Sequence, residues 1–360
     1  MDVQELLDLT VKNKASDLHL LVGVPPSIRI DGILRYLSDK GKISPEELEK
    51  MVYSLITPEQ KELLIANKEL DFSIGYGGGE YGDIGRLRVN AYFQRGYISA
   101  AFRFLPRAIK SIEELNLPQV LHRFAKMRQG FVLVAGPTGH GKSTTLAAMI
   151  NEINMTKSFH ILTIEDPIEY IYPTGNSLIS QRELGNDTHS WGMALRSALR
   201  EDPDVVLVGE MRDPETMQAA LTIAETGHLV FATLHTNSAA QSIDRVVDSF
   251  PDHQRSQIRT QLASTLRGII SQRLLPRIGG GRVPAVEILL DTPAVANNIR
   301  EGKTHLIDSV IQTSKELGMI TLEDSLSQLV LSGIVKYDDA RVYAIHEDEL
   351  LRLSGQMGQA

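Results

Sequence analysis

A glycine-rich run at residues 136–144 has the residue types and spacing of a phosphate-binding loop. It reads GPTGHGKST, follows the apolar segment FVLVA and opens a helix-favouring segment, which is the strand, loop and helix context that the motif requires. Glycines let the backbone curl so that successive N–H groups point at phosphate oxygens, and the start of the helix adds the positive end of its dipole. The sequence therefore predicts that ATP binds at Gly136, Pro137, Thr138, Gly139, His140, Gly141, Lys142, Ser143 and Thr144.

Three side chains of this loop are expected to play different parts. Lys142 should reach the β- and γ-phosphates, and Ser143 should be a ligand of Mg²⁺, so the expected cofactors are ATP and Mg²⁺. His140 stands at a variable position of the motif, and we interpret it as a passenger rather than a catalyst.

Acidic residues that could support hydrolysis follow two apolar runs. Transfer of a phosphoryl group to water needs Mg²⁺ to offset charge and a carboxylate to orient or deprotonate the water. Glu210 ends the run VVLVGE, so we predict that it is the catalytic base or water-orienting group. An ordinary Walker B strand has Asp where this chain has Gly209, so we assign Mg²⁺ positioning, partly through water, to Glu165 of ILTIED, with Asp166 as a secondary candidate. The alternative for each is a helix-capping or solvated acid.

Two pairs of basic residues are further candidates. His228 and His235 flank the apolar run LVFATL, and we predict His235 as a γ-phosphate sensor and His228 as a structural or interface residue. Metal binding by these histidines is disfavoured because no third ligand has suitable spacing. Arg196 and Arg200 are four apart, which predicts that they share one helix face and are secondary catalytic candidates.

The segment between residues 84 and 112 carries several cations but no Asp or Glu, although the chain as a whole is acidic. Arg86 and Arg88 are two apart and would share one face of a strand. A solvated basic face is the simpler interpretation. We hypothesise instead that Arg88 and Arg103, and less directly Arg86, reach the γ-phosphate of a neighbouring subunit, so that hydrolysis depends on assembly.

The elements that would position these residues indicate two domains. The first hundred residues predict an α+β domain with a helix near 1–14, a strand pair across Asp31 and Gly32, a capping box from Ser44 to Glu47, and strands at 70–76, 84–94 and 96–105. From residue 130 short apolar runs alternate with helical segments, which predicts a mostly parallel sheet with helices on both faces, an α/β fold. Residues 253–345 should be mainly helical apart from a hairpin across Gly279 to Gly281. The expected domains are 1–108 and 123–360, joined by a linker at 109–122 that includes a second capping box, Ser111 to Glu114.

Composition narrows the classes of protein. The 360 residues contain 37 Lys and Arg against 45 Asp and Glu, a net charge of −8, so no general nucleic-acid surface is expected. There is no cysteine, which excludes disulfides and fits a reducing compartment. No signal peptide or transmembrane segment is predicted. We therefore expect a cytoplasmic protein that is at most peripheral to a membrane.

Four segments together resemble the signature boxes of secretion-type ATPases: GPTGHGKST, ILTIEDPIEY, ALRSALREDPD running into LVGEMRD, and TGHLVFATLHTNSA. SDLHL and GRLRVNAYFQRG also look like the N-terminal domain of the type IV pilus retraction ATPases, so the resemblance covers nearly the whole chain. It implies a smaller PAS-like domain, a RecA-like P-loop NTPase domain and a homo-hexameric motor. It also implies docking on an inner-membrane platform protein at the pilus base, and a role in pilus retraction and twitching motility.

The subfamily rests on fewer residues. Extension and secretion ATPases of this superfamily typically carry a longer N-terminal region and a four-cysteine zinc motif, so the absence of cysteine favours retraction. Retraction ATPases carry a motif of the form AIRNLIRE, and residues 294–301 read AVANNIRE, with Ala296 and Asn298 as the main departures. The alternatives are an accessory or paralogous retraction ATPase, an extension or secretion ATPase, and a nucleotide-gated scaffold. A small-molecule kinase and a DNA-translocating motor are disfavoured.

Overall fold

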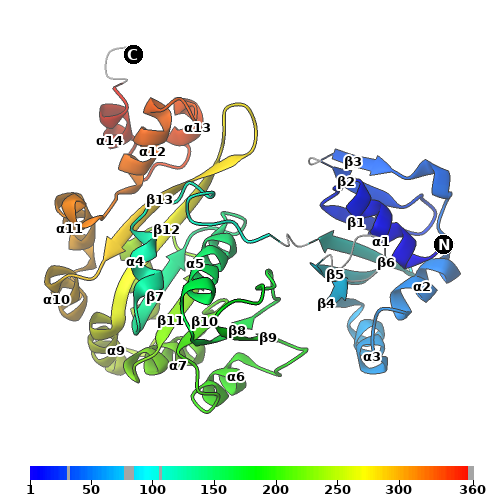
Figure 1. The fold of residues 1–360 in the computed structure, drawn as a ribbon, viewed down its shortest axis with the longest axis horizontal. Helices are drawn as coiled ribbons and strands as arrows, with labels where there is room; N and C mark the ends of the chain where they lie inside the picture. The colour runs from blue at the N-terminus through cyan, green and yellow to red at the C-terminus, as the bar shows by residue number, and fades with distance from the viewer. Residues whose placement is uncertain (31–32, 77–84, 105–107, 356–360) are drawn as a thin grey trace. The chain divides into compact units, whose positions relative to one another are not determined.

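The chain forms two units, each with its own buried apolar core (Figure 1). The computed structural model describes residues 1–30, 33–76, 85–104 and 108–355. By their contacts these residues divide into an N-terminal unit, residues 1–108 with 167–171, and a C-terminal unit, residues 109–166 with 172–360.

The N-terminal unit is a six-stranded antiparallel sheet with three helices. Its strands lie in the order β3-β2-β1-β6-β5-β4. The elements are α1 (Val3–Lys12), β1 (Asp17–Leu20), β2 (Ser27–Ile30), β3 (Ile33–Tyr36), α2 (Pro45–Tyr53), α3 (Pro58–Asn67), β4 (Glu69–Tyr76), β5 (Gly85–Gln94) and β6 (Tyr97–Phe104). This confirms the predicted α+β character. The predicted turn at Asp31 and Gly32 and the turn between β4 and β5, residues 77–84, lie outside the described residues.

Local sequence accounts for these elements. Ser44 and Glu47 exchange backbone and side-chain hydrogen bonds at the start of α2, which confirms the predicted capping box. Along β5, Leu87 and Val89 are buried while Arg88 between them is exposed, the period-2 pattern of a strand with one face on a core. The two arginines that were expected on one face, Arg86 and Arg88, therefore lie opposite the buried face.

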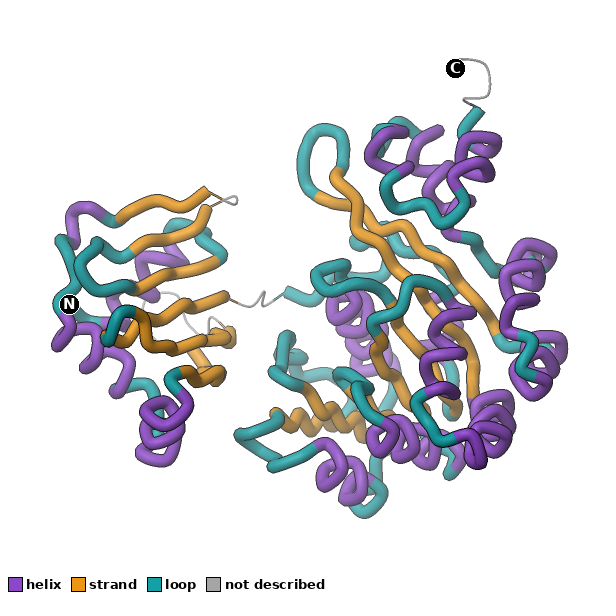
Figure 2. The backbone as a smooth tube through the Cα atoms, turned by 180° about the vertical axis from the view of Figure 1, so that it is seen from behind, coloured by secondary structure: helices purple, strands orange, loops and turns teal. Residues whose placement is uncertain are grey.

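The C-terminal unit contains a seven-stranded sheet in the order β13-β12-β7-β11-β10-β8-β9 (Figure 2). All neighbours are parallel except the β12–β13 hairpin, which confirms the predicted α/β fold. Its strands are β7 (Gly130–Ala135), β8 (His160–Glu165), β9 (Leu178–Glu183), β10 (Val205–Val208), β11 (Leu229–Leu234), β12 (Leu266–Pro276) and β13 (Arg282–Leu290). The edge strand β9 was not predicted, because LISQRE lacks a sustained apolar run.

Helices flank this sheet and continue beyond it. They are α4 (Leu121–Lys126), α5 (Lys142–Thr156), α6 (Trp191–Ala198), α7 (Pro214–Glu225), α8 (Ala239–Asp248), α9 (Asp252–Thr265), α10 (Pro293–Glu301), α11 (Ile307–Thr313), α12 (Leu322–Leu331), α13 (Tyr337–Arg341) and α14 (Glu347–Leu353). α4 packs on α5, whereas α6, α7 and α9 form a second group. The last three helices share a small apolar cluster with the β12–β13 hairpin, and the hairpin's turn falls at Gly279–Gly281 as predicted.

Two further observations concern the ends of elements. Ser111 and Glu114 exchange the predicted capping hydrogen bonds, but they close a turn rather than the start of a helix. In the part of the chain that the structure describes, no helix combines the length and the apolar character needed to cross a bilayer.

Candidate active site

The glycine-rich loop lies between the end of β7 at Ala135 and the start of α5 at Lys142. Gly136 and Gly141 have φ angles of 144° and 82°, which side chains rarely adopt. A Cβ atom on Gly136 would lie 2.4 Å from the carbonyl oxygen of Gln272 on β12. The loop is therefore curled as predicted and packed tightly against the neighbouring strand.

Lys142 is buried within its own loop, with 8% of its surface exposed. Its Nζ donates to the carbonyl oxygens of Gly136 at 2.8 Å and Pro137 at 3.1 Å. The ammonium group is thus held over the curl of the loop, where a phosphate would sit.

The order of strands brings the predicted catalytic residues to one edge. The sequence β7-β11-β10-β8 places the loop after β7, His235 after β11, Glu210 after β10 and Glu165 at the end of β8. Because these strands are parallel, their carboxyl ends meet at the same edge of the sheet, where ligands of open α/β sheets bind.

Close contacts join Lys142, His235 and Glu210. His235 Nδ1 lies 3.5 Å from Lys142 Nζ, and His235 Nε2 lies 3.2 Å from Glu210 Oε1. Since the ammonium group can only donate, the contacts require a neutral imidazole that accepts at Nδ1 and donates from Nε2. Burial lowers the pKa of His235, and the charge of Lys142 lowers it further, while Glu210 opposes both. His235 thus connects the loop lysine with the candidate base.

Arg212 is a member of this cluster that sequence reasoning missed. Its guanidinium makes an ion pair of 2.8 Å with Glu210 Oε2, and this hydrogen bond raises the pKa of Arg212. The exposed Asp166 adds to the field around Arg212. The signal was present in the spacing, because Arg212 follows Glu210 by two residues.

Glu165 is the buried acid of the site, 9% exposed. It accepts a hydrogen bond of 2.7 Å from Thr163 and a longer one of 3.4 Å from Gln181. Gly209 lies against it: a Cβ there would be 3.2 Å from the Cα of Glu165. A side chain at position 209 would therefore press on the backbone of β8, and the buried acid of this site is Glu165 on β8.

The donor set fits a magnesium ion. Ser143 in the first turn of α5 offers a hydroxyl oxygen, and Glu165 offers a carboxylate that Thr163 holds in one orientation. Hard oxygen ligands combined with waters and phosphates are what Mg²⁺ takes in nucleotide sites.

His228 lies at the opposite end of β11 from His235. Its Nδ1 is 3.0 Å from the carbonyl oxygen of Ile223 and 3.0 Å from Thr226 Oγ1, at the end of α7. These contacts tie the helix end to the next strand, in keeping with the structural part expected of it.

The candidate arginines of the N-terminal unit lie on the exposed face of its sheet. Arg88 and Arg103 are cross-strand partners on β5 and β6, and Arg86 donates to Ser73 at 2.8 Å. Arg103 also pairs with Asp17 at 3.0 Å, although 68% of its side chain is exposed. Burial alone would raise the pKa of Asp17, but hydrogen bonds from Ser16 and Arg103 outweigh it and lower the pKa.

The second arginine pair lies on the C-terminal unit and needs a correction. Arg196 is on α6, but the helix ends at Ala198, and the backbone N–H of Arg200 bonds to the carbonyl oxygen of Ser197, three residues back. Arg200 therefore lies in a turn and not on the same helix face. Both still line one open cavity of about 470 Å³. Arg196 is paired with Glu215 of α7 at 2.6 Å.

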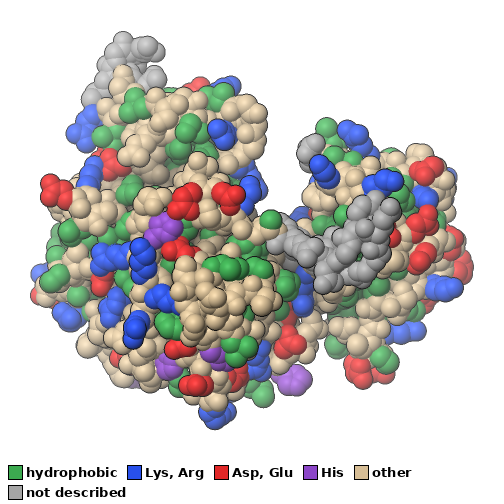
Figure 3. All heavy atoms as spheres, in the orientation of Figure 1, with side chains coloured by type: hydrophobic (Ala, Val, Ile, Leu, Met, Phe, Trp, Pro, Cys, Tyr) green, Lys and Arg blue, Asp and Glu red, His purple; other side chains and the backbone are tan. Residues whose placement is uncertain are grey.

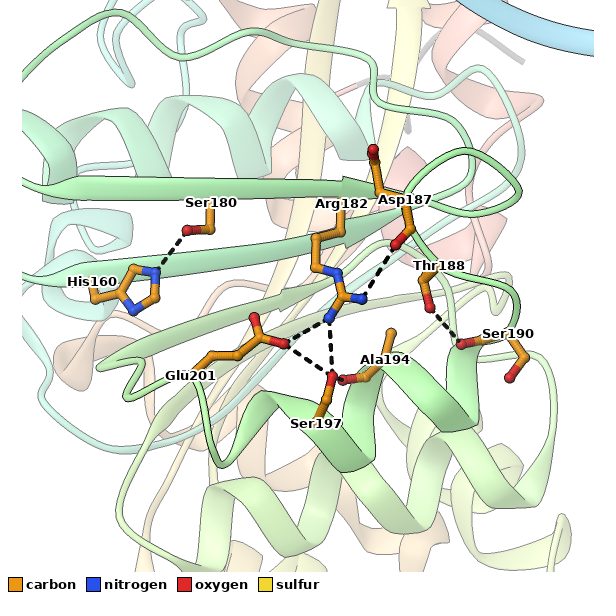
Figure 4. Close-up of polar contacts among 9 residues, drawn as sticks. All are labelled: His160, Ser180, Arg182, Asp187, Thr188, Ser190, Ala194, Ser197 and Glu201. Atoms are coloured by element: carbon orange, nitrogen blue, oxygen red, sulfur yellow. Dashed lines mark hydrogen bonds and ion pairs between the residues drawn. The ribbon is translucent and has the colours of Figure 1, made fainter. Parts of the chain in front are cut away.

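Arg182 on β9 fixes the wall of this cavity. Figure 4 shows its guanidinium pointing to the end of α6, where it donates to Ser197 of the helix at 3.0 Å and to Glu201 just after it at 2.7 Å. A further bond of 3.3 Å reaches the carbonyl oxygen of Asp187. On the face of the C-terminal unit drawn in Figure 3, acidic and basic side chains are interspersed.

Comparison with known proteins gives similarity over both units. Residues 108–280 match the family described as Type II/IV secretion system protein. PilT of Pseudomonas aeruginosa, described as a type IV pilus retractation ATPase, is 48% identical over 341 residues, 95% of this chain and 97% of PilT. PilU of the same organism, described as a type IV pilus ATPase, is 39% identical over 359 residues, 99% of this chain and 92% of PilU. The crystal structure of the pilus retraction motor PilT with bound ADP matches with a TM-score of 0.91 and 46% identity, covering 98% of this chain and 99% of that one.

Proposed function

This chain belongs to the type II/IV secretion system proteins and, within them, to the pilus retraction ATPases; from this premise we propose that it hydrolyses ATP to drive type IV pilus retraction. The fold is that of the family, a RecA-like ATPase domain with a smaller N-terminal domain. The observation that carries the proposal is the contact series from Lys142 through His235 to Glu210 at one sheet edge.

Nucleotide binding is supported by the space around the loop. The loop and the start of α5 supply backbone N–H groups and Lys142 for the phosphates. A cavity of about 280 Å³ opens beside them, lined by Gly141, Thr144, Thr145 and Leu274 among others. It adjoins the loop, so it is where the nucleoside part of ATP would lie.

Hydrolysis is assigned to Glu210. Its carboxylate would orient and deprotonate the attacking water, while His235 and Arg212 hold it in place. Lys142 would stabilise charge on the β- and γ-phosphates. Mg²⁺, held by Ser143 and by Glu165 partly through water, supplies charge neutralisation of the phosphates.

We propose that the arginines of the N-terminal unit act on the nucleotide bound by a neighbouring copy of the chain. Arg88 and Arg103 are exposed and adjacent on one sheet face, so their guanidinium groups are accessible to an anion of another subunit. A guanidinium placed on a γ-phosphate raises turnover about 10³-fold or more. Arg86 lies on the same face and would support them. Hydrolysis would then require a ring, which we propose is a homo-hexamer.

The partner of the ring is a membrane-embedded platform of the pilus base. We propose that the ring is cytoplasmic and docks peripherally on this inner-membrane protein, because retraction must transmit force from ATP to a fibre that crosses the membrane. Order and domain closure on nucleotide binding are how such force is generated in other switches.

The test of this function is steady-state ATP hydrolysis measured against protein concentration, with the mass of the assembly followed by size exclusion. We expect specific activity to rise steeply as the hexamer forms. Lys142→Ala provides the inactive reference. A monomer with full specific activity would contradict the proposal that arginines act on a neighbouring subunit. Absence of hydrolysis in an intact hexamer would contradict the proposed ATPase activity.

An accessory retraction motor is the second candidate, and α10 favours it. This helix carries the AVANNIRE segment, in which Val295 and Ile299 are buried while Ala296 and Asn298 depart from the expected motif. Replacing Ala296 by Arg and Asn298 by Leu restores the expected motif and tests whether these two departures mark an accessory motor. If the chain is the main motor, a strain lacking the gene loses surface movement and the unchanged protein restores it; an accessory motor restores movement only alongside a second retraction ATPase.

A further inference from the structure

The phosphate-binding loop is fastened to β12 by contacts that no phosphate motif requires. Gln272 is buried, 2% exposed, and its Nε2 donates to the carbonyl oxygen of His140 at 2.8 Å. Its Oε1 accepts from Thr145 Oγ1 at 2.7 Å. One amide side chain thus bonds both the loop and the first turn of α5.

Two glycines of the loop leave room for this side chain. A Cβ on Gly141 would lie 2.8 Å from Gln272 Nε2, and one on Gly136 would overlap the Gln272 carbonyl oxygen. The loop therefore cannot move closer to β12, and its conformation depends on the side chain and backbone of Gln272 on that strand.

His140 adds a second fastening two residues further along β12. Its Nδ1 accepts a hydrogen bond of 2.9 Å from the backbone N–H of Leu274. The ring also meets Tyr343, which follows α13, edge to face, with centroids 5.8 Å apart. His140 is thus the side chain through which the loop contacts both β12 and the C-terminal helices.

The electrostatic surroundings keep His140 in the accepting form. Burial lowers its pKa, and the positive charges of Arg273, Lys142 and Arg282 lower it further. Arg282 also donates to the carbonyl oxygen of Gly139 at 3.4 Å. The ring is therefore uncharged at neutral pH, and the N–H of Leu274 selects the tautomer that carries its proton on Nε2 and accepts at Nδ1.

We propose that His140 is a positioning residue for nucleotide binding: its Nδ1 holds the phosphate-binding loop closed on β12, and Tyr343 holds the ring in place. This deepens the proposed function, on which it rests, and replaces the interpretation of His140 as a passenger. The physical basis is preorganisation, because a loop already held in its binding shape loses less freedom when phosphate arrives.

The experiment compares three variants of His140 in the full chain. His140→Ala removes the acceptor, His140→Leu keeps bulk without an acceptor, and His140→Asn places an amide oxygen where Nδ1 stood. We expect the Kd for ATP and the KM to rise about tenfold in the first two, the effect of one lost hydrogen bond. The value of kcat should change much less, and His140→Asn should restore affinity to within about threefold of the unchanged protein.

Tyr343→Ala tests the second half of the proposal. We expect a rise in Kd of about threefold, in the range of an aromatic pair. In the double variant with His140→Ala, Tyr343→Ala should add nothing further, because the ring it supports is gone. His305→Ala, an exposed histidine elsewhere in the same unit, is the matched control and should leave Kd unchanged.

Circular dichroism and melting temperature establish that each variant is folded. If any single variant fails to fold, the remaining members of the series still compare acceptor with no acceptor. Equal Kd for His140→Leu and His140→Asn, or additive effects of His140→Ala and Tyr343→Ala, overturn the inference. Failure of the unchanged protein to bind ATP would instead overturn the proposed function.

Discussion

The nucleotide edge of the C-terminal unit and the arginine face of the N-terminal sheet both carry cations suited to phosphate, but they hold them differently. Lys142 is buried and bonded to two carbonyl oxygens of its own loop. Arg88 and Arg103 lie exposed on adjacent strands. The first region is ordered before a ligand arrives, whereas the second lies open to water, with Arg103 joined to Asp17 by an ion pair.

This difference indicates that the first region binds nucleotide in each subunit and that the second acts only after subunits assemble. A buried, bonded cation has already lost its conformational freedom, so ligand binding costs it little. An exposed arginine must be desolvated and immobilised by its partner before it contributes. The nucleotide edge therefore suits constitutive binding, and the arginine face suits an action that waits for assembly.

Glu210→Gln would break the first region and is expected to have the largest effect. Glutamine keeps the shape of the side chain but cannot accept a proton, so hydrolysis should fall by up to about 10⁴-fold. ATP should stay bound, because Lys142 and the loop are untouched. Single-turnover hydrolysis and nucleotide retention measure the two effects, with Glu316→Gln, an exposed acid elsewhere in the same unit, as control. Unchanged turnover would favour a nucleotide-gated scaffold instead.

Arg88→Ala would break the second region. If Arg88 acts on a neighbour's γ-phosphate, turnover by the assembled ring should fall by about 10³-fold while the Kd for ATP changes little. Arg103→Ala should act in the same direction. Arg95→Ala, at the turn between β5 and β6, is the matched control and should be neutral. Mixing Arg88→Ala with Glu210→Gln protein should restore part of the activity if the two act across an interface.

The same contrast explains how far sequence could predict the site. The position of the loop, Glu165, Glu210 and His235 at one sheet edge was predictable, because strand ends in a parallel sheet converge and a strand end can be recognised locally. Arg212 and Gln272 were missed because their importance lies in contacts, one with Glu210 and one across 132 residues with His140. His140 was underrated for the same reason.

The fold divides in a similar way. Strands with a continuous apolar run, such as β7, β10 and β11, were predicted, whereas β9 is polar and forms only because β8 offers an edge. The prediction that Arg200 shares a helix face with Arg196 was wrong, because α6 ends at Ala198 and Arg200 lies in the turn that follows.

One buried carboxyl group in each unit, Glu287 and Asp17, should affect stability with opposite dependence on pH. Measuring both extends the comparison of the two units. Burial raises the pKa of Glu287 on β13 to about 7. Between its ordinary value of 4.5 and about 7 the folded state holds one proton more than the unfolded state, so stability falls as pH rises through this window. The glutamine of Glu287→Gln stays neutral at every pH. The free energy of unfolding of this variant, relative to that of the unchanged protein, should therefore be about 3 kcal/mol higher at pH 8 than at pH 5. Urea unfolding at both pH values, at one protein concentration, measures it.

Asp17 on β1 provides the counterpart from the N-terminal unit. Its lowered pKa means that the stability it contributes is present above the ordinary value of 3.8 and is lost as pH falls below it. Asp17→Asn should therefore be destabilising at neutral pH and less so in acid. The same pH dependence of stability for both variants would contradict the contrast between a buried carboxyl held by Ser16 and Arg103 and one whose pKa is raised by burial.

Two ion pairs near α6 give the smallest expected effects and separate buried from exposed charge within one unit. Arg182 and Glu201 are about three-quarters buried, with 25% and 28% of their side chains exposed, and Ser197 shares their hydrogen bonds. Arg182→Met should cost about 1 kcal/mol, because it leaves Glu201 half-buried without its cation. Arg196 and Glu215 are 64% and 65% exposed, so Arg196→Met should cost close to nothing. Urea unfolding of both variants measures the difference, and equal costs would show that burial does not decide what these arginines contribute.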